Sequence, residues 1–392
     1  MDLWIKILSF YLIFFIGFLV GVLGLEKINF KVFDEIYFIE QAYNYFEKKD
    51  YFDGHPPLAK IFYAFLFYLW GKENYFPVRV CWLIISSLLG PLVFLWVLEK
   101  TKDYSWSFLA GFLVNIESFT LFFRKFLLLE IPWLVLSFLA LYFLARKKYY
   151  LFFIFAGLGL STKWFSLFFL FPFALIELQN LPLKKIITGF ILMLIVYFLI
   201  FEIHFLLINN KFKIYFVDFL KYNLIMLVAH QSYPSYSILL STFVLGWPFG
   251  VKPISYMQIY AFPNILIFWL IVIAIIYSLF RFNRLPLFLQ YLILGYLFYF
   301  IVIFFIEILR PGWIYFYLGS LILGMIILSF FLKKNFYYLI PLTFFSAFLL
   351  PATSYTQFLG IEKIIFQKLD SFLSDLDIFF RNLGILLGFR WF

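Results

Sequence analysis

The sequence predicts an all-α, polytopic membrane protein, and three observations support this fold class. Of its 392 residues, 65% are hydrophobic and 13% are charged, whereas a soluble domain of this length needs far more polar surface. Apolar runs long enough to cross a bilayer recur along nearly the whole chain. Clusters of lysine and arginine separate several of these runs, as they do in cytoplasmic loops. A soluble globular protein is therefore excluded.

The first apolar run is interpreted as a retained membrane span, because it is long and lacks a small-x-small cleavage site before Glu26. Four basic clusters, at 146–148, 184–185, 281–284 and 333–334, can all face the cytoplasm only if an even number of crossings separates them. With the N-terminus inside, about eleven spans satisfy this condition. The predicted spans are 4–24, 79–98, 106–122, 130–145, 149–161, 163–178, 186–208, 263–280, 286–306, 313–332 and 336–351.

This topology places three polar segments on the extracytoplasmic face, namely 25–78, 209–262 and a tail from 352 to 392. The first is acidic: between Leu25 and Pro56, seven carboxylates face four lysines. The net charge of +10 therefore comes largely from basic residues at the cytoplasmic surface, and we expect no nucleic-acid partner. Residues 1–351 are predicted to form the transmembrane domain.

The first loop is predicted to contain a juxtamembrane helix, because Glu35, Ile39, Ala42 and Phe46 recur at helical spacing. Asp34 and Glu35 would begin this helix, where carboxylates are favoured by the helix dipole and by unpaired N–H groups. From local sequence alone, such capping explains the acidic pair better than catalysis does. The His-Pro-Pro that follows is equally compatible with a simple rigid turn.

The combination of these features is more specific. The stretch "FDE…YF.DGHPPLAK" resembles the first extracytoplasmic loop of the protein O-mannosyltransferases, which belong to the GT-C class of glycosyltransferases that use lipid-phosphate-linked sugars. In that family an Asp-Glu pair opens the loop, as Asp34-Glu35 does here, and His-Pro-Pro-Leu-Ala/Gly-Lys closes it, as His55 to Lys60 does. Weaker similarity continues to about residue 325. It covers Arg79 in "FPVRVCW", Lys163 in "GLGLSTKW", Trp247 and Lys252 in "GWPFGVKP", and Arg310, Tyr315 and Tyr317 in "RPGWIYFY".

Two departures from the family pattern stand out. Where the family commonly has Ser-Arg followed by Leu-Leu-Asp, this chain reads "FFRKFLLLE", so that either Arg124 or Lys125 takes the arginine position and Glu130 replaces the aspartate. Segment 209–262 leaves no room for the soluble domain of eukaryotic members. The chain thus resembles the minimal prokaryotic form, which implies a cell membrane with the active site on its extracytoplasmic face.

The chemistry implied by this resemblance needs a base for the attacking hydroxyl and cations for the departing phosphate. We expect Asp34 to be the base in a one-step, inverting transfer from a polyprenyl or dolichyl phosphate sugar to a protein or peptide hydroxyl. The resemblance gives mannose as the sugar and gives Glu35 a role in holding the acceptor. His55, Lys60, Arg79, Lys163, Arg310, Tyr315 and Tyr317 are the expected donor-binding residues, and Arg124, Lys125, Glu130, His230, Trp247 and Lys252 are further candidates.

For Arg79, Lys163 and Arg310, the alternative is that each side chain simply extends to the membrane interface. No metal cofactor is expected, because the three histidines show no ligand spacing and basic side chains suffice for a monophosphate donor. Asp34, Glu35 and Asp53 are the carboxylates that would otherwise suit a hard cation. The tail from Ile361 repeats apolar residues every three or four positions, which predicts an amphipathic interfacial helix.

Two other functions remain open at this point. A GT-C enzyme that glycosylates a lipid or a growing glycan, as the aminoarabinose transferases do, would share the acidic loop and the cations. A transporter would favour inverted repeats and polar residues near mid-membrane. The chain shows no internal repeat, and its polar residues collect at one predicted face.

Overall fold

The computed structural model describes residues 3–209, 214–229, 244–250, 254–256, 259–261, 264–309 and 314–334, together with residue 378. It divides into two compact units. The first unit comprises Met1–Asn115 and Phe123–His230, and the second comprises Ile116–Phe122 and Gln231–Phe392. The predicted span 336–351 and the predicted amphipathic tail lie outside the described residues, apart from residue 378.

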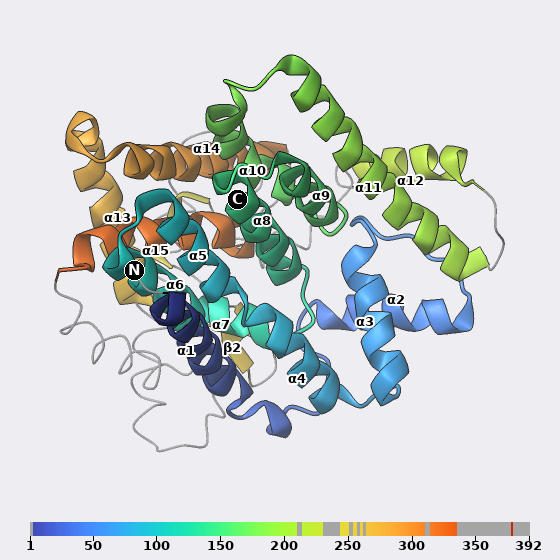
Figure 1. Ribbon diagram of the computed structural model, residues 1–392. Helices are drawn as coiled ribbons and strands as arrows, with labels where there is room; N and C mark the ends of the chain where they lie inside the picture. The colour runs from blue at the N-terminus through green and yellow to red at the C-terminus, as the bar shows by residue number, and fades with distance from the viewer. Residues whose placement is uncertain are drawn as a thin grey trace. The chain divides into compact units, whose positions relative to one another are not determined.

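The first unit is helical throughout its described residues (Figure 1). Its membrane-type helices overlap the predicted spans, which confirms the fold class, although the predicted spans 79–98 and 106–122 each consist of two helices. Three further helices, α2, α3 and α12, lie in the predicted extracytoplasmic segments. The helices are α1 (Leu3–Val22), α2 (Glu35–Glu47), α3 (Leu58–Trp70), α4 (Tyr75–Ser86), α5 (Leu89–Thr101), α6 (Tyr104–Ile116), α7 (Ser118–Lys125), α8 (Glu130–Ala145), α9 (Tyr149–Leu160), α10 (Phe165–Leu178), α11 (Leu183–Asn209) and α12 (Phe216–Ala229), with a 3-10 turn η1 (Leu25–Lys27).

The second unit is also mainly helical, but it contains one short hairpin that the all-α prediction lacked. Strands β1 and β2 pair antiparallel with Ile254 opposite Ala261. A side-chain cap begins α13, where Asn264 accepts a hydrogen bond from the backbone N–H of Ile267 at 3.2 Å. The elements are η3 (Val244–Phe249), β1 (Ile254–Tyr256), β2 (Ile259–Ala261), α13 (Ile265–Phe280), η4 (Phe282–Arg284), α14 (Leu287–Leu309), η5 (Ile314–Tyr317) and α15 (Leu318–Leu332).

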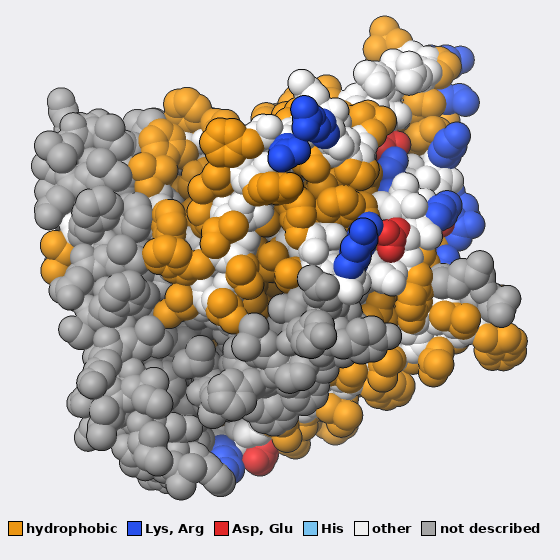
Figure 2. All heavy atoms as spheres, turned by 90° about the vertical axis from the view of Figure 1, so that its left-hand side faces the viewer, with side chains coloured by type: hydrophobic (Ala, Val, Ile, Leu, Met, Phe, Trp, Pro, Cys, Tyr) orange, Lys and Arg blue, Asp and Glu red, His pale blue; other side chains and the backbone are white. Residues whose placement is uncertain are grey.

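Several helices have the length and composition of membrane spans. Among the described residues, five segments qualify, or six if α6 and α7, which are bent by 60° at their break, count as one span. Helices α8, α9, α10 and α13 are apolar but shorter, so the number of crossings remains a prediction. Hydrophobic side chains cover much of the described surface in Figure 2, as expected of a face in contact with lipid. The protein is therefore a multi-pass membrane protein.

Close helix packing in the first unit depends on small residues. Helix α9 packs against α8 on one side and α11 on another (Figure 1). At Gly157 of α9, an added Cβ would lie 2.7 Å from the backbone oxygen of Met193 on α11. Such close backbone approach is typical of helix interfaces in membranes, where packing rather than water exclusion drives association. This interface fixes the end of α9, which carries part of the candidate site.

Candidate active site

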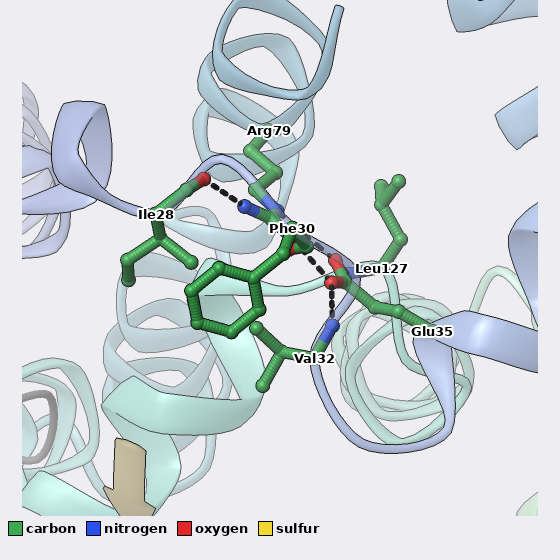
Figure 3. Close-up of polar contacts among 6 residues, drawn as sticks. All are labelled: Ile28, Phe30, Val32, Glu35, Arg79 and Leu127. Atoms are coloured by element: carbon green, nitrogen blue, oxygen red, sulfur yellow. Dashed lines mark hydrogen bonds and ion pairs between the residues drawn. The ribbon is translucent and has the colours of Figure 1, made fainter. Parts of the chain in front are cut away.

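A buried ion pair joins Glu35, the first residue of α2, to Arg79 of α4 (Figure 3). Both side chains are 0% exposed. Arg79 donates to the Glu35 carboxylate from Nε at 3.2 Å and from Nη2 at 2.5 Å. The backbone N–H groups of Val32 and Leu127 donate to the same carboxylate, each at 2.8 Å. The two oxygens of Glu35 are therefore satisfied by protein donors.

The same arginine also holds the segment that leads into α2. Arg79 Nη1 donates to the carbonyl of Ile28 at 2.7 Å, and Nη2 donates to that of Phe30 at 2.6 Å (Figure 3). All three nitrogens of this buried guanidinium thus donate hydrogen bonds to backbone carbonyls or to the Glu35 carboxylate. In this arrangement Arg79 and Glu35 bind each other and the segment before α2. Their expected roles, Arg79 toward the donor phosphate and Glu35 toward the acceptor, stay predictions.

The carboxylate of Asp34 has a different environment from that of Glu35. Asp34 occupies the position directly before α2, yet its side chain makes no capping hydrogen bond, so the capping interpretation of this residue is not supported. Within the described part of the chain, no hydrogen bond or ion pair to the Asp34 carboxylate is present, and the residue is partly exposed. Its carboxylate is therefore available to an external proton donor.

Glu130 and Lys163 form an ion pair that acts on Asp34. Glu130 is the first residue of α8, Lys163 lies in the turn between α9 and α10, and their Oε1 and Nζ atoms are 2.6 Å apart. The pKa of Asp34 is raised to about 7 from an ordinary value near 4: burial is the largest cause, Glu130 and, more weakly, Asp53 also raise this pKa, and Lys163 lowers it. Asp34 thus lies within electrostatic reach of the predicted cation Lys163.

A second ion pair, between Asp53 and Lys60, lies on the other side of the same loop. Lys60, in the first turn of α3, is 0% exposed and donates to the Asp53 carboxylate and to the carbonyl oxygen of His55, the latter at 2.6 Å. Burial lowers the pKa of Lys60, and Asp53 opposes this effect. The ring of His55 lies 6.3 Å from that of Phe38 on α2. Lys60 therefore binds both His55 and Asp53, and the carboxylate of Asp53 is occupied by this lysine.

Backbone contacts bring the separate motifs together. The N–H of Leu58, which follows His-Pro-Pro, donates to the carbonyl of Ser161 in the Ser-Thr-Lys stretch at 3.0 Å. The hydroxyl of Tyr63 donates to the carbonyl of Leu128 at 2.8 Å. These two contacts join the His-Pro-Pro segment and α3 to segments that lie 103 and 65 residues further along the chain.

Arg124 and Lys125, the two candidates for the family's arginine position, bind different parts of the protein. Arg124 is 0% exposed and donates to the carbonyl of Asn115 at 2.5 Å and to the Ser87 hydroxyl at 2.8 Å. Lys125 donates to the carbonyl of Leu23 at 2.9 Å. Both side chains are buried and bind the ends or breaks of neighbouring helices, so neither is placed as a phosphate ligand.

Three predicted residues lie within the described part of the second unit. Trp247 is 0% exposed, and its ring lies 6.3 Å from that of Phe316. The hydroxyl of Tyr317 is hydrogen bonded to that of Tyr296 at 2.8 Å, whereas Tyr315 is partly exposed. The remaining candidates, Arg310, His230 and Lys252, lie outside the described residues.

Sequence reasoning also missed several polar residues around the site. His204 of α11 is hydrogen bonded through Nδ1 to the hydroxyl of Tyr45 on α2 at 2.7 Å. Tyr222 of α12 accepts a hydrogen bond from the backbone N–H of Asp53 at 3.1 Å. Their only sequence signal is a polar group inside an apolar run. Across the described ranges, no three His, Cys, Asp or Glu side chains are grouped to hold a metal ion.

Comparison with known proteins points to one family. Residues 11–229 match the family profile of dolichyl-phosphate-mannose-protein mannosyltransferases. The dolichyl-phosphate-mannose–protein mannosyltransferase 4 of Schizosaccharomyces pombe is 33% identical over 113 residues, a match that covers 24% of this chain and 14% of that relative. The structure of the S. cerevisiae protein O-mannosyltransferase Pmt1-Pmt2 complex bound to the sugar donor aligns with a TM-score of 0.73 at 12% identity, over 98% of this chain and 90% of that chain. At this identity the structural match establishes the fold alone.

Proposed function

The chain belongs to the dolichyl-phosphate-mannose-protein mannosyltransferase family, and on this premise we propose that it transfers mannose from a polyprenyl or dolichyl phosphate to serine or threonine hydroxyls of proteins. The curated relative carries that activity in its name, and the structural neighbour is described as bound to the sugar donor. Family membership favours this function over a transporter.

The observation that carries the proposal is the state of Asp34. Its carboxylate is partly exposed and free of hydrogen bonds to the described residues, and burial raises its pKa to about 7. A general base works best when its pKa lies near the operating pH, because it is then deprotonated yet still basic enough to accept a proton. The neighbouring carboxylate of Glu35, by contrast, already accepts hydrogen bonds from Arg79 and from two backbone N–H groups.

In the proposed reaction, Asp34 takes the proton of the acceptor hydroxyl while the hydroxyl oxygen attacks the anomeric carbon of mannose. The bond between that carbon and the phosphate oxygen breaks, and the polyprenyl phosphate leaves with the bonding electrons. A single displacement inverts the anomeric configuration. The departing phosphate is a weak base, so that no general acid is required.

Lys163 is the proposed cation for the leaving phosphate, because it is the positive charge that acts on Asp34 and it belongs to a motif that docks on the His-Pro-Pro segment. His55 and Lys60 are proposed to shape the pocket near the donor, and Arg310, outside the described residues, is retained as a donor ligand from the family resemblance. Glu35 and Arg79 are positioning residues that fix the start of α2.

The site is proposed to face the extracytoplasmic side of a cell membrane, with the donor anchored in the outer leaflet and with no metal cofactor. The positive-inside distribution of lysine and arginine supports this orientation. A donor of this kind enters from lipid while the acceptor enters from water, which suits a loop that lies at the end of apolar helices.

The proposal is tested with purified protein in detergent, polyprenyl-phosphate-[³H]mannose and a peptide rich in serine and threonine. A peptide with alanine at those positions is the matched control. Transfer to the first peptide alone, with the inverted anomer by NMR, is the expected result. Label transferred to an added lipid or glycan instead of the peptide would favour the alternative GT-C function, and absence of transfer to any acceptor would overturn the assignment.

A further inference from the structure

Two adjacent residues of α12, Tyr222 and Asn223, form hydrogen bonds to different parts of the Asp34 site. The hydroxyl of Tyr222 accepts from the backbone N–H of Asp53 at 3.1 Å. The side-chain oxygen of Asn223 accepts from the hydroxyl of Tyr197 on α11 at 2.5 Å. Two neighbouring side chains of one short helix are thus tied to two separate segments.

The link through Asn223 continues to the segment that carries Lys163. The Tyr197 hydroxyl, which donates to Asn223, accepts a hydrogen bond from the indole Nε1 of Trp164 at 3.0 Å. Trp164 directly follows Lys163, and Lys163 pairs with Glu130. The chain of contacts from α12 therefore ends beside the ion pair that acts on Asp34.

Helix α12 is otherwise lightly held. Met226 is 0% exposed and joins the aromatic cluster around Phe201, with Phe219 and Tyr222 packed against it. Much of the remaining surface of α12 is exposed and apolar, including Phe216 and Leu220. On the inner face of the helix, Tyr222 and Asn223 each supply a polar contact to a neighbouring segment.

We propose that α12 is a positioning strap for the transfer reaction, in which Tyr222 fixes Asp53 and Asn223 fixes, through Tyr197 and Trp164, the turn that carries Lys163. The strap thereby holds Asp53 and Lys163, two charged residues that act on the catalytic carboxylate of Asp34. This inference rests on the proposed function, because it assigns a role to residues that do not themselves touch the reacting atoms.

The two links are expected to act on Asp34 with opposite sign. Asp53 is negative and raises the pKa of Asp34, whereas Lys163 is positive and lowers it. Releasing Asp53 therefore lowers this pKa, and releasing Lys163 raises it. The other charged or titratable groups around the site are Lys60, Tyr63 and His55 from the first loop, Glu130 from α8, and Glu35, which Arg79 neutralises.

The test is the pH dependence of kcat/KM for mannose transfer, because a merely structural role would lower the rate without moving the profile. In Tyr222→Phe the acidic limb is expected to move to lower pH by about half a unit. In Asn223→Leu, and equally in Tyr197→Phe, it is expected to move to higher pH by about half a unit. The double variant Asn223→Leu/Tyr197→Phe should move the acidic limb no further than either change alone, because both changes break the same hydrogen-bonded link.

The matched control is Tyr68→Phe, which makes the same chemical change at a residue of α3 that is 75% exposed, and its profile should coincide with that of the unchanged protein. Profiles of the α12 variants that coincide with the unchanged protein, or that all move in one direction, would overturn the strap while leaving the proposed function intact. An unchanged protein without transfer activity would overturn both. If Tyr222→Phe fails to fold, the Tyr197→Phe shift decides the outcome.

Discussion

Asp34 and Glu35 are consecutive carboxylates at the start of α2, yet their environments are opposite. The Glu35 carboxylate is fully buried and accepts hydrogen bonds from Arg79, Val32 and Leu127, whereas that of Asp34 has no such bond among the described residues. A residue that is held so firmly fixes the backbone of its neighbour. Glu35 therefore positions Asp34 while Asp34 keeps its carboxylate free for chemistry.

The Glu35–Arg79 pair is predicted to stabilise the fold strongly. Replacing Arg79 by Met leaves a buried carboxylate without its cation, and the expected loss in free energy of unfolding is about 3–5 kcal/mol. Thermal unfolding in detergent measures this loss. The matched control is Lys72→Met, which breaks an exposed pair with Glu47 and should leave the free energy of unfolding nearly unchanged. If Arg79→Met kept the stability of the unchanged protein and only raised KM for the lipid donor, Arg79 would be a phosphate ligand after all.

Activity is predicted to fall as pH decreases through about 7. The raised pKa of Asp34 means that its carboxylate takes up a proton in this range and can no longer act as a base. The measurement is kcat/KM for transfer as a function of pH. An acidic limb near pH 4, the ordinary range of an aspartate, would show that the environment of Asp34 is not the one described here.

Glu130→Gln is predicted to move the acidic limb of the pH profile of kcat/KM to lower pH. Glu130 raises the pKa of Asp34, and its loss also frees the positive charge of Lys163, which lowers it. Both effects have the same sign, so the carboxylate stays ionised at lower pH. The exposed acid Glu40 provides the control, since Glu40→Gln should leave the profile in place. A shift to higher pH in Glu130→Gln would contradict the electrostatic account of the site.

Gly157→Val is predicted to destabilise the first unit. The added Cβ would lie 2.7 Å from the backbone oxygen of Met193, so α9 and α11 would have to separate. Overpacking of this kind typically costs about 1–3 kcal/mol, which thermal unfolding detects. The change Ile195→Val, on the exposed face of α11, should have little effect. Equal stability of Gly157→Val and the unchanged protein would mean that the two helices are not in close contact.

Transfer is predicted to persist after treatment with a chelator, because a monophosphate donor needs only basic side chains. Metal content by mass spectrometry and activity with excess EDTA check this together. Loss of activity that is restored by Mg²⁺ or Mn²⁺ would instead assign a metal to the carboxylates of the first loop.

Much of the fold could be predicted from sequence because membrane spans are local features. Apolar length and the distribution of basic residues predicted the positions of α1, α8 and α11, and the helical spacing of Ile39 and Ala42 predicted α2. The hairpin formed by β1 and β2 was missed, since its strands have three residues each and give no periodic signal.

The site was predictable only in part. The motif resemblance indicated Asp34, His55, Lys60 and Lys163, and the structure brings these residues into one region. The partners of charged residues were not predictable, because pairing across distant helices depends on how the helices pack. Arg79 and Glu35, which are 44 residues apart in sequence, form a buried ion pair, and nothing in the sequence indicated this pairing.

The most direct test of the account is mannose transfer to a serine- and threonine-rich peptide by Asp34→Asn, with Asp50→Asn, an exposed acid of the same loop, as the control. The account predicts that Asp34→Asn loses transfer while its thermal unfolding matches that of the unchanged protein, and that Asp50→Asn stays active. A folded Asp34→Asn protein that transfers mannose at the normal rate would contradict the assignment of Asp34 as the base.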